Sequence, residues 1–572
     1  MDAYRTATTL RARMSLALLA GAVLAVLALG YRFYGGFVAR QYALDDATPT
    51  PATVHEDGVD FVPTRPFYLL GQHFSAIAAA GPIAGPILAA QQFGWLPALL
   101  WICVGVVFIG AVHDLSTLVA SVRHDAKSIA EVVKVQLGPR AGVAMLVFIW
   151  VALVYVIVAF TDVTASTFVQ GDPELEGLTF DFHPGGAVAA ASTMYLLLAI
   201  VLGLVDKFLK PKLWLSTVIF VPATLAVVWL GTKLSTFISF GPVTWGVLIL
   251  AYCFVASLAP MWLLLQPRGY LGGFILYLAL AAGIIGLFFG GFEVHLPAFK
   301  GFSVGGGTGT LFPFLFVTIA CGACSGFHGL VCSGTTSKQI ARESHCHPVG
   351  FGAMLLEGFV AVIALATAMV ISGSEMTGKA PGTIYGIGLG RFVAVVLGER
   401  HLAVATTFGA MAFSTFVFDT LDVSTRLGRY ILQELFGWKS RAGGLIATAL
   451  TAGAPMSFIF IATPGSWRSF WTLFGTSNQL LAALSLMGVS VWLQRMGKRY
   501  WYTLVPTVLV SLVTVSSLVL QIADGLRGDA TAVVRINAIV AFTLLALAAN
   551  LLWLGARALV RGRQVTLGSA AA

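Results

Sequence analysis

The sequence has 572 residues, of which 58% are hydrophobic and 10% are charged, with a net charge of +9. A soluble domain carries about 25% charged residues, so this composition excludes a soluble globular protein and indicates a polytopic membrane protein. The positive charge does not indicate nucleic-acid binding, because the basic residues cluster between apolar segments, as in cytoplasmic loops. The six cysteines lie in or beside apolar runs, which does not fit a secreted disulfide framework.

The sequence predicts an all-α membrane protein with about 15 transmembrane helices, since one crossing takes roughly 20 apolar residues. The stretch 384–397 is shorter and is expected to be re-entrant or interfacial. The expected spans are 15–36, 68–92, 95–122, 141–168, 186–206, 212–231, 243–265, 270–291, 311–334, 350–373, 401–422, 443–463, 468–494, 501–522 and 532–556.

Charge alternates between the connections of these spans. Basic residues gather in 123–140, 207–212 and 426–441, whereas Glu293 and the stretch 524–529 bring acidic residues to the alternate connections. Loops rich in Lys and Arg stay in the cytoplasm. We therefore expect a multi-pass protein of the bacterial plasma membrane whose C-terminus is cytoplasmic.

A Gly-Pro-rich motif interrupts the second apolar span. Gly81-Pro-Ile-Ala-Gly85-Pro cannot continue a regular α-helix, because proline lacks the N–H and clashes with the preceding turn. A simple structural kink is one reading. A break inside a membrane is, however, tolerated only where it is buried in protein or lines a cavity, and transporters bind substrates there. We expect a substrate carboxylate near Gly81, Pro82 and Gly85, with His73 and Ser75 close by.

A second candidate break, Ser257-Leu-Ala-Pro260, falls five crossings later in a span of opposite direction. A chance proline kink is the alternative. Opposite direction at an offset of five is what a five-plus-five inverted repeat requires, so Pro260 joins the expected substrate site. The resulting division gives an N-terminal helix and loop (1–66), two repeats (67–231 and 232–425) and C-terminal accessory helices (426–572).

Buried ionisable residues give candidates for coupling to an ion. His113 and Asp114 lie inside the span 95–122, where a charge is costly and marks an ion or proton path by default, unless the pair simply bonds to Arg123. Asp422 is expected either to form a helix-end ion pair with Arg426 or to relay protons.

The segment 321–337 combines small, hydroxylated and metal-ligating residues. Close helix packing with oxygen ligands for an ion, including Ser325 and His328, is one reading. An intramembrane metal site is the other, although the spacing matches no standard zinc pattern. We expect no metal, cofactor or enzymatic activity. The residues that the metal reading would use are Cys321, Cys324, His328, Cys332, His345, Cys346 and His347.

The chain resembles the carbon starvation protein A (CstA) family of peptide and pyruvate transporters between about residues 31 and 494. Gly71-Gln-His-Phe-Ser75 and Asp422-Val-Ser-Thr-Arg426 are among the motifs that carry this likeness. The other matching stretches are 31–35, 58–64, 76–86, 262–271, 311–328, 333–336, 473–475 and 478–479.

The resemblance implies a secondary active importer of small carboxylate-bearing nutrients, peptides or pyruvate, in carbon-starved cells. It implies coupling to protons, with sodium as the alternative ion, and a LeuT-like inverted-repeat fold. In that fold 68–92 would be the first core helix, 243–265 the sixth and 311–334 the eighth. The first and eighth would hold a cation between the backbone around residues 79–82 and Ser325.

Overall fold

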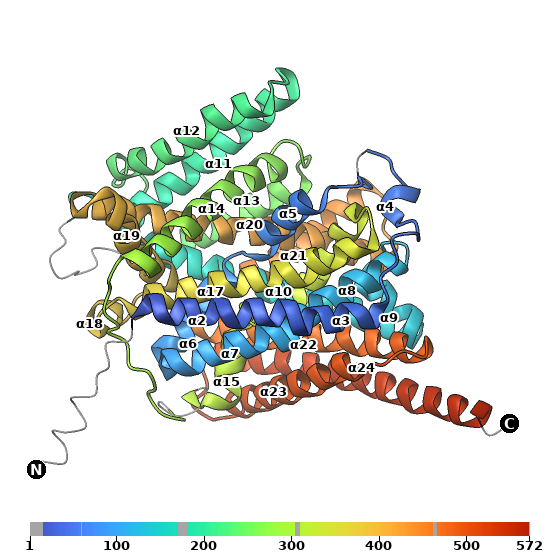
Figure 1. Cartoon of the computed structure of the whole chain (residues 1–572). Coiled ribbons are helices and arrows are strands. Elements are labelled where there is room, and N and C mark those ends of the chain that lie inside the picture. The colour runs from blue at the N-terminus through green and yellow to red at the C-terminus, as the bar shows by residue number, and fades with distance from the viewer. Residues whose placement is uncertain (1–14, 59, 170–179, 304–308, 462–465, 571–572) are drawn as a thin grey trace, which may run out of the picture.

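The computed structural model describes residues 15–58, 60–169, 180–303, 309–461 and 466–570 (Figure 1). Within these ranges the chain is helical, with two isolated β-bridges and no longer strand. The first half contains α2 (Leu16–Leu29), η1 (Gly30–Gly35), α3 (Gly36–Tyr42), α4 (Pro51–Val54), α5 (Pro66–Ile77), α6 (Gly81–Phe93), α7 (Trp95–Gly105), η2 (Val106–Gly110), α8 (Ala111–Arg123), α9 (Ile129–Leu137), α10 (Pro139–Val169), α11 (Pro184–Phe208), α12 (Leu213–Lys233), α13 (Pro242–Leu258) and α14 (Leu265–Phe289).

The second half begins with two short helices and ends with two long ones. It contains α15 (Leu311–Thr318), α16 (Gly326–Gly334), η4 (Thr336–Gln339), η5 (Glu343–His345), η6 (His347–Gly352), α17 (Ala353–Met369), α18 (Gly373–Met376), α19 (Pro381–Leu397), η7 (Glu399–His401), α20 (Leu402–Phe436), α21 (Arg441–Ile461), α22 (Trp467–Arg495), α23 (Trp501–Gly525) and α24 (Ala532–Ala570).

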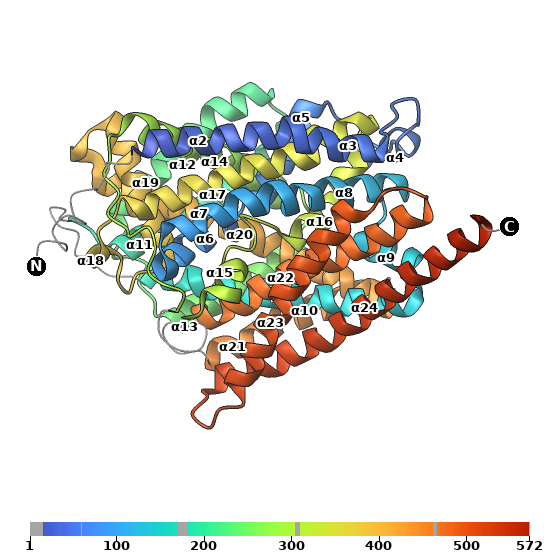
Figure 2. The same cartoon turned by 60° about the horizontal axis from the view of Figure 1, so that its bottom comes forward.

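The helices run roughly along one axis, so the bundle has two ends (Figures 1 and 2). Eleven helices of the described chain are long and apolar enough to cross a membrane, or twelve if the bent pair α5–α6 is one span. The expected all-helical membrane architecture is confirmed, but the count of 15 crossings is not. Each of the 15 segments holds a helix, yet α13 has only 17 residues and 311–334 is split into two short helices.

The first break lies just before the Gly-Pro motif and not within it. α5 ends at Ile77, α6 begins at Gly81, and their axes differ by 47°. The unwound residues are Ala78 to Ala80, with Ala78 at ψ 52°. Pro82 occupies the first turn of α6, where no backbone N–H is needed, which explains why the motif starts a helix instead of ending one.

The second break lies in 319–325, between α15 and α16, where the sequence predicted a continuous span. The motif Ser257–Pro260 does not interrupt a helix; it ends α13 and begins the turn to α14. The two broken helices are antiparallel. Val62 N–H donates to Lys338 O where α5 begins and α16 ends, and Lys300 N–H donates to Phe93 O where α6 ends and α15 approaches.

Each broken helix packs against the helix that follows the other break. α6 packs against α17, and α16 packs against α8. At the centre α10 packs against α20, and α13 packs against α21. The antiparallel hairpin α11–α12 lies at one edge of the bundle, and α23 and α24 lie along the opposite side (Figures 1 and 2). This arrangement places both breaks inside protein, as a break at membrane depth requires.

Candidate functional site

The two breaks contact each other directly. A Cβ atom added to Gly81 would lie 2.4 Å from Cys321 Sγ, and one added to Gly85 would lie 2.6 Å from the carbonyl oxygen of Thr318. Only glycine permits an approach this close. All residues from 81 to 86 are buried. The N-termini of α6 and α16 therefore both begin in the interior, beside the C-termini of α5 and α15.

Asn478 of α22 forms hydrogen bonds with three residues at the second break. Its Nδ2 donates to Ser325 Oγ at 3.0 Å and to Cys321 Sγ at 3.2 Å, and its Oδ1 accepts from Phe327 N–H at 2.9 Å. The side chain thereby satisfies a donor in the first turn of α16, one of the groups that every helix start leaves unpaired. Ser325 is thus held by an amide in this structure.

A buried cluster of ionisable side chains joins α8, α16 and α17. Asp114 Oδ1 lies 2.8 Å from His113 Nδ1, and Asp114 Oδ2 lies 2.9 Å from His328 Nδ1. The other ring nitrogen of His328 lies 3.2 Å from Glu357 Oε2. All four side chains are at most 1% exposed. The alternative of an Asp114–Arg123 bond is wrong, because Arg123 pairs with Glu343 at 2.7 Å.

His73 lies beside this cluster and not at the first break. Its Nδ1 is 2.9 Å from Thr336 Oγ1, and its Nε2 is 3.8 Å from Cys332 Sγ. Cys332 Sγ in turn lies 3.6 Å from the backbone oxygen of Asp114. His73 therefore connects the end of the bundle where α16 terminates with the ionisable cluster.

A second buried charge cluster joins α13, α14 and α20. Arg268 is fully buried, contacts Asp419 and lies 2.8 Å from Asp422. Tyr252 OH donates to the same Asp422 oxygen at 2.7 Å. Asp422 is thus paired with Arg268 and not with Arg426 as the sequence suggested. Arg426 instead donates to the carbonyl groups that end α13.

The remaining expected substrate residues are dispersed. Ser75 faces α14, where a Cβ on Gly273 would lie 3.6 Å from its oxygen. Pro82 is buried near Gly322, within the contact between the two breaks. Pro260 is exposed at the turn between α13 and α14. Among the described residues no group of three or more His, Cys, Asp or Glu side chains could hold a metal ion.

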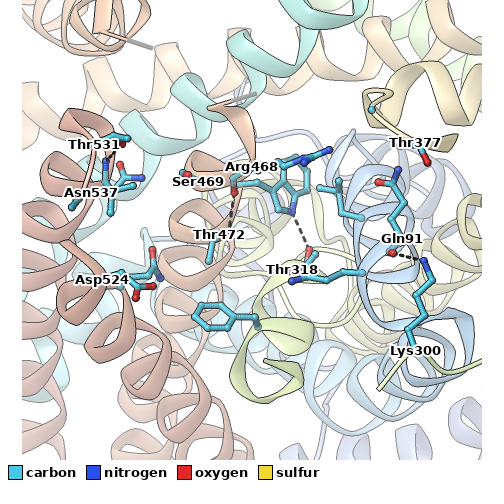
Figure 3. Close-up of a pocket in the computed structure, with 18 of the residues that line it drawn as sticks. Gln91, Lys300, Thr318, Thr377, Arg468, Ser469, Thr472, Asp524, Thr531 and Asn537 are labelled. Carbon is cyan, nitrogen blue, oxygen red and sulfur yellow. Dashed lines mark hydrogen bonds between the residues drawn. The ribbon is translucent and has the colours of Figure 1, made fainter. Parts of the chain in front are cut away.

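A cavity of about 710 Å³ lies at the end of the bundle where α6 and α23 terminate (Figure 3). Lys300 and Gln91 line one side, Asp524 and Asn537 line the other, and Thr318 lies between them at the end of α15. Lys300 Nζ donates to Gln91 O at 2.7 Å. Because Thr318 immediately precedes the second break and its carbonyl contacts Gly85, one wall of the cavity adjoins the contact between the breaks.

Sequence reasoning missed Glu357 and Arg268 as members of buried clusters. Glu357 is the only charged residue in the expected span 350–373, a signal that identifies an intramembrane functional candidate by itself. Arg268 follows directly after an expected crossing and looked like a loop charge. No sequence signal places it against two aspartates more than 150 positions away.

Comparison with known proteins gives matches over most of the chain. Residues 14–384 and 372–517 match the sequence model described as carbon starvation protein CstA. The chain is 33% identical to the peptide transporter CstA of Helicobacter pylori J99, over 87% of this chain and 80% of that protein. It is 34% identical to the peptide transporter CstA of Escherichia coli K12, over 86% and 78%. It is 30% identical to the pyruvate/proton symporter BtsT of the same organism, over 88% and 81%.

Solved structures with a similar arrangement are more distant. A manganese transporter of Eremococcus coleocola matches with a TM-score of 0.43 and 13% identity, covering 86% of this chain and 95% of the transporter. MhsT in complex with L-phenylalanine matches with a TM-score of 0.41 and 16% identity, covering 84% of this chain and 98% of MhsT.

Proposed function

The chain belongs to the carbon starvation protein CstA family, and we propose that it imports peptides or pyruvate in symport with protons. It is a multi-pass membrane protein and a transporter. The observation that carries the proposal is the contact between two broken helices beside a buried cluster of titratable side chains. Such breaks hold substrates and coupling ions in secondary transporters, and buried titratable groups mark proton paths.

We place the substrate carboxylate where the breaks meet. The N-termini of α6 and α16 both begin there, and each contributes backbone N–H groups and the positive end of a helix dipole. Gly81, Pro82 and Gly85 supply the close approach on one side. Ser325, held by Asn478, supplies a hydroxyl group on the other. Pro260 is too exposed to belong to this site and is left out of it.

The proposed repeats differ from the division made on sequence. The first would comprise α5–α8, α10, α13 and α14, with the hairpin α11–α12 inserted at its edge. The second would comprise α15–α17 and α20–α22. This division makes α15–α16 the sixth core helix and not the eighth, and it is supported by the matched packing of α6 on α17 and of α16 on α8.

We propose that the cytoplasmic end is the one where α8 and α16 terminate, because Arg123, Lys127, Lys134 and Lys338 lie there. The cavity beside Lys300 would then be the periplasmic entrance in the bacterial plasma membrane. His113, Asp114 and His328 are the proposed proton-coupling residues. Asp422 is a weaker candidate, because Arg268 pairs with it through one carboxylate oxygen, which Tyr252 also contacts.

Uptake into proteoliposomes tests the function. Purified protein should accumulate labelled pyruvate or a labelled dipeptide above the external concentration when the lumen is alkaline, and a protonophore should abolish the accumulation. Liposomes without protein are the control. Accumulation driven by a sodium gradient at equal pH would assign the other coupling ion, and failure to transport either substrate class would refute the proposal.

A further inference from the structure

The tautomers in the ionisable cluster are fixed by Asp114. Both of its oxygens face a ring Nδ1, that of His113 at 2.8 Å and that of His328 at 2.9 Å. An ionised carboxylate only accepts hydrogen bonds, so both Nδ1 atoms carry the hydrogen. If His328 is neutral, its Nε2 then carries a lone pair that points away from Asp114.

That second nitrogen faces Glu357. Nε2 lies 3.2 Å from Glu357 Oε2, and no other donor among the described residues forms a hydrogen bond with either Glu357 oxygen. An ionised, fully buried carboxylate without a donor is costly, and it would also face a nitrogen lone pair. The contact is favourable only when a proton lies between Nε2 and the carboxyl group.

We propose that Glu357 and His328 form the binding site of the transported proton, with Asp114 and His113 fixing the ring of His328. This inference rests on the proposed proton symport and assigns its ion site. Loading adds one proton to the pair, so the pair then carries one negative charge fewer than in the unloaded state. The site joins α17, which packs against α6 of the first break, to α16 of the second break and to α8, which packs against α16. Loading can therefore influence how the broken helices pack.

Other titratable groups surround Glu357. Asp114 and His328 interact with it electrostatically, and so do Cys321 and Cys324 from the second break. His73 of α5 interacts with Asp114 and His328 and contacts Thr336 near the cytoplasmic end. His73 is therefore a further titratable group beside the pair, on the side of the proposed cytoplasmic end.

Infrared spectroscopy tests the site without substrate. Reconstituted wild-type protein should show a protonated carboxylic acid band that titrates with external pH, and Glu357→Gln should remove it. Asp114→Asn should leave a titrating acid band. Glu399→Gln, in the exposed 3₁₀ turn η7, is the matched control and should retain the wild-type signal. A titrating band that survives in Glu357→Gln would overturn the assignment, even if the substrates proposed above are wrong.

Proton flux tests its role. Addition of substrate to wild-type proteoliposomes containing a pH-sensitive dye should acidify the lumen. Glu357→Gln should abolish this acidification while counterflow of labelled substrate stays within about twofold of wild type. Should Glu357→Gln fail to fold, His328→Gln retains hydrogen-bonding groups but cannot titrate, and it should show the same uncoupling. A folded variant of either residue with wild-type proton uptake would refute the proposal.

Discussion

Gly81 of α6 lies against Cys321 in the second break, so closely that a Cβ on Gly81 would come within 2.6 Å of Cys321 Cβ. The two interruptions of the membrane helices are therefore one packed unit. A glycine at this point has two explanations, substrate approach and helix packing, and the structure provides a way to separate them.

Gly81→Ala should abolish uptake and destabilise the protein by about 1–3 kcal/mol, because the new methyl group overpacks the contact. Adding Cys321→Gly removes the clashing side chain. If Gly81 matters only for packing, the double variant should recover both its melting temperature and substrate affinity. If the carboxylate binds at this backbone, the double variant should regain stability while its affinity stays at least tenfold reduced. Substrate binding to the folded double variant is the deciding measurement.

The existence of a break near the Gly-Pro motif could be predicted from its sequence, because proline disfavours a continuous helix. Its position could not, since Pro82 fits the first turn of α6 and Pro86 lies inside that helix. The second break has no proline within 319–325. Its unpaired carbonyls are satisfied by distant side chains: Trp471 donates to Thr318 O at 3.1 Å, and Gln479 donates to Phe316 O at 2.9 Å. No local pattern contains that information.

The ionisable site was only half predictable for the same reason. His113, Asp114 and His328 could be found because intramembrane ionisable residues are rare. Their assembly depends on α8, α16 and α17 meeting, which sequence distance does not reveal. Pro260 was misplaced because a proline that ends a helix and a proline that breaks one have the same local sequence signature.

Asp114→Asn should reduce pH-driven accumulation by at least tenfold while substrate exchange at equal pH remains within about threefold of wild type. The amide cannot hold the negative charge that orients both imidazole rings. Uptake and counterflow measured on the same proteoliposome preparation check this. Unchanged uphill uptake with an unchanged pH profile would remove Asp114 from the coupling mechanism.

Lys300→Gln should raise the substrate concentration for half-maximal uptake, with little effect on the maximal rate. Lys300 is exposed at the rim of the cavity that leads to Thr318, so its charge attracts a carboxylate without contacting the final site. The effect should shrink as ionic strength rises, because salt screens exposed charges. Lys439→Gln, in the connection between α20 and α21, is a control of equal charge change. An equal effect of both variants would contradict a local role.

Arg268 provides a test of whether Asp422 takes part in coupling. Arg268→Met leaves Asp419 and Asp422 buried without their cation, and breaking such a pair typically costs about 3–5 kcal/mol. We expect loss of folded protein or a large fall in melting temperature. The triple variant Arg268→Met, Asp419→Asn, Asp422→Asn removes every charge of this cluster and should fold again.

Proton-driven uptake by that triple variant decides whether Asp422 takes part in coupling. If the Arg268 cluster only joins α14 to α20, the refolded triple variant should accumulate substrate at a wild-type ratio, because the Glu357–His328 pair is intact. If Asp422 carries a proton, the triple variant should exchange substrate but fail to accumulate it. We expect the first outcome, since Arg268 lies 2.8 Å from Asp422 Oδ2, and a cation this close favours the ionised carboxylate.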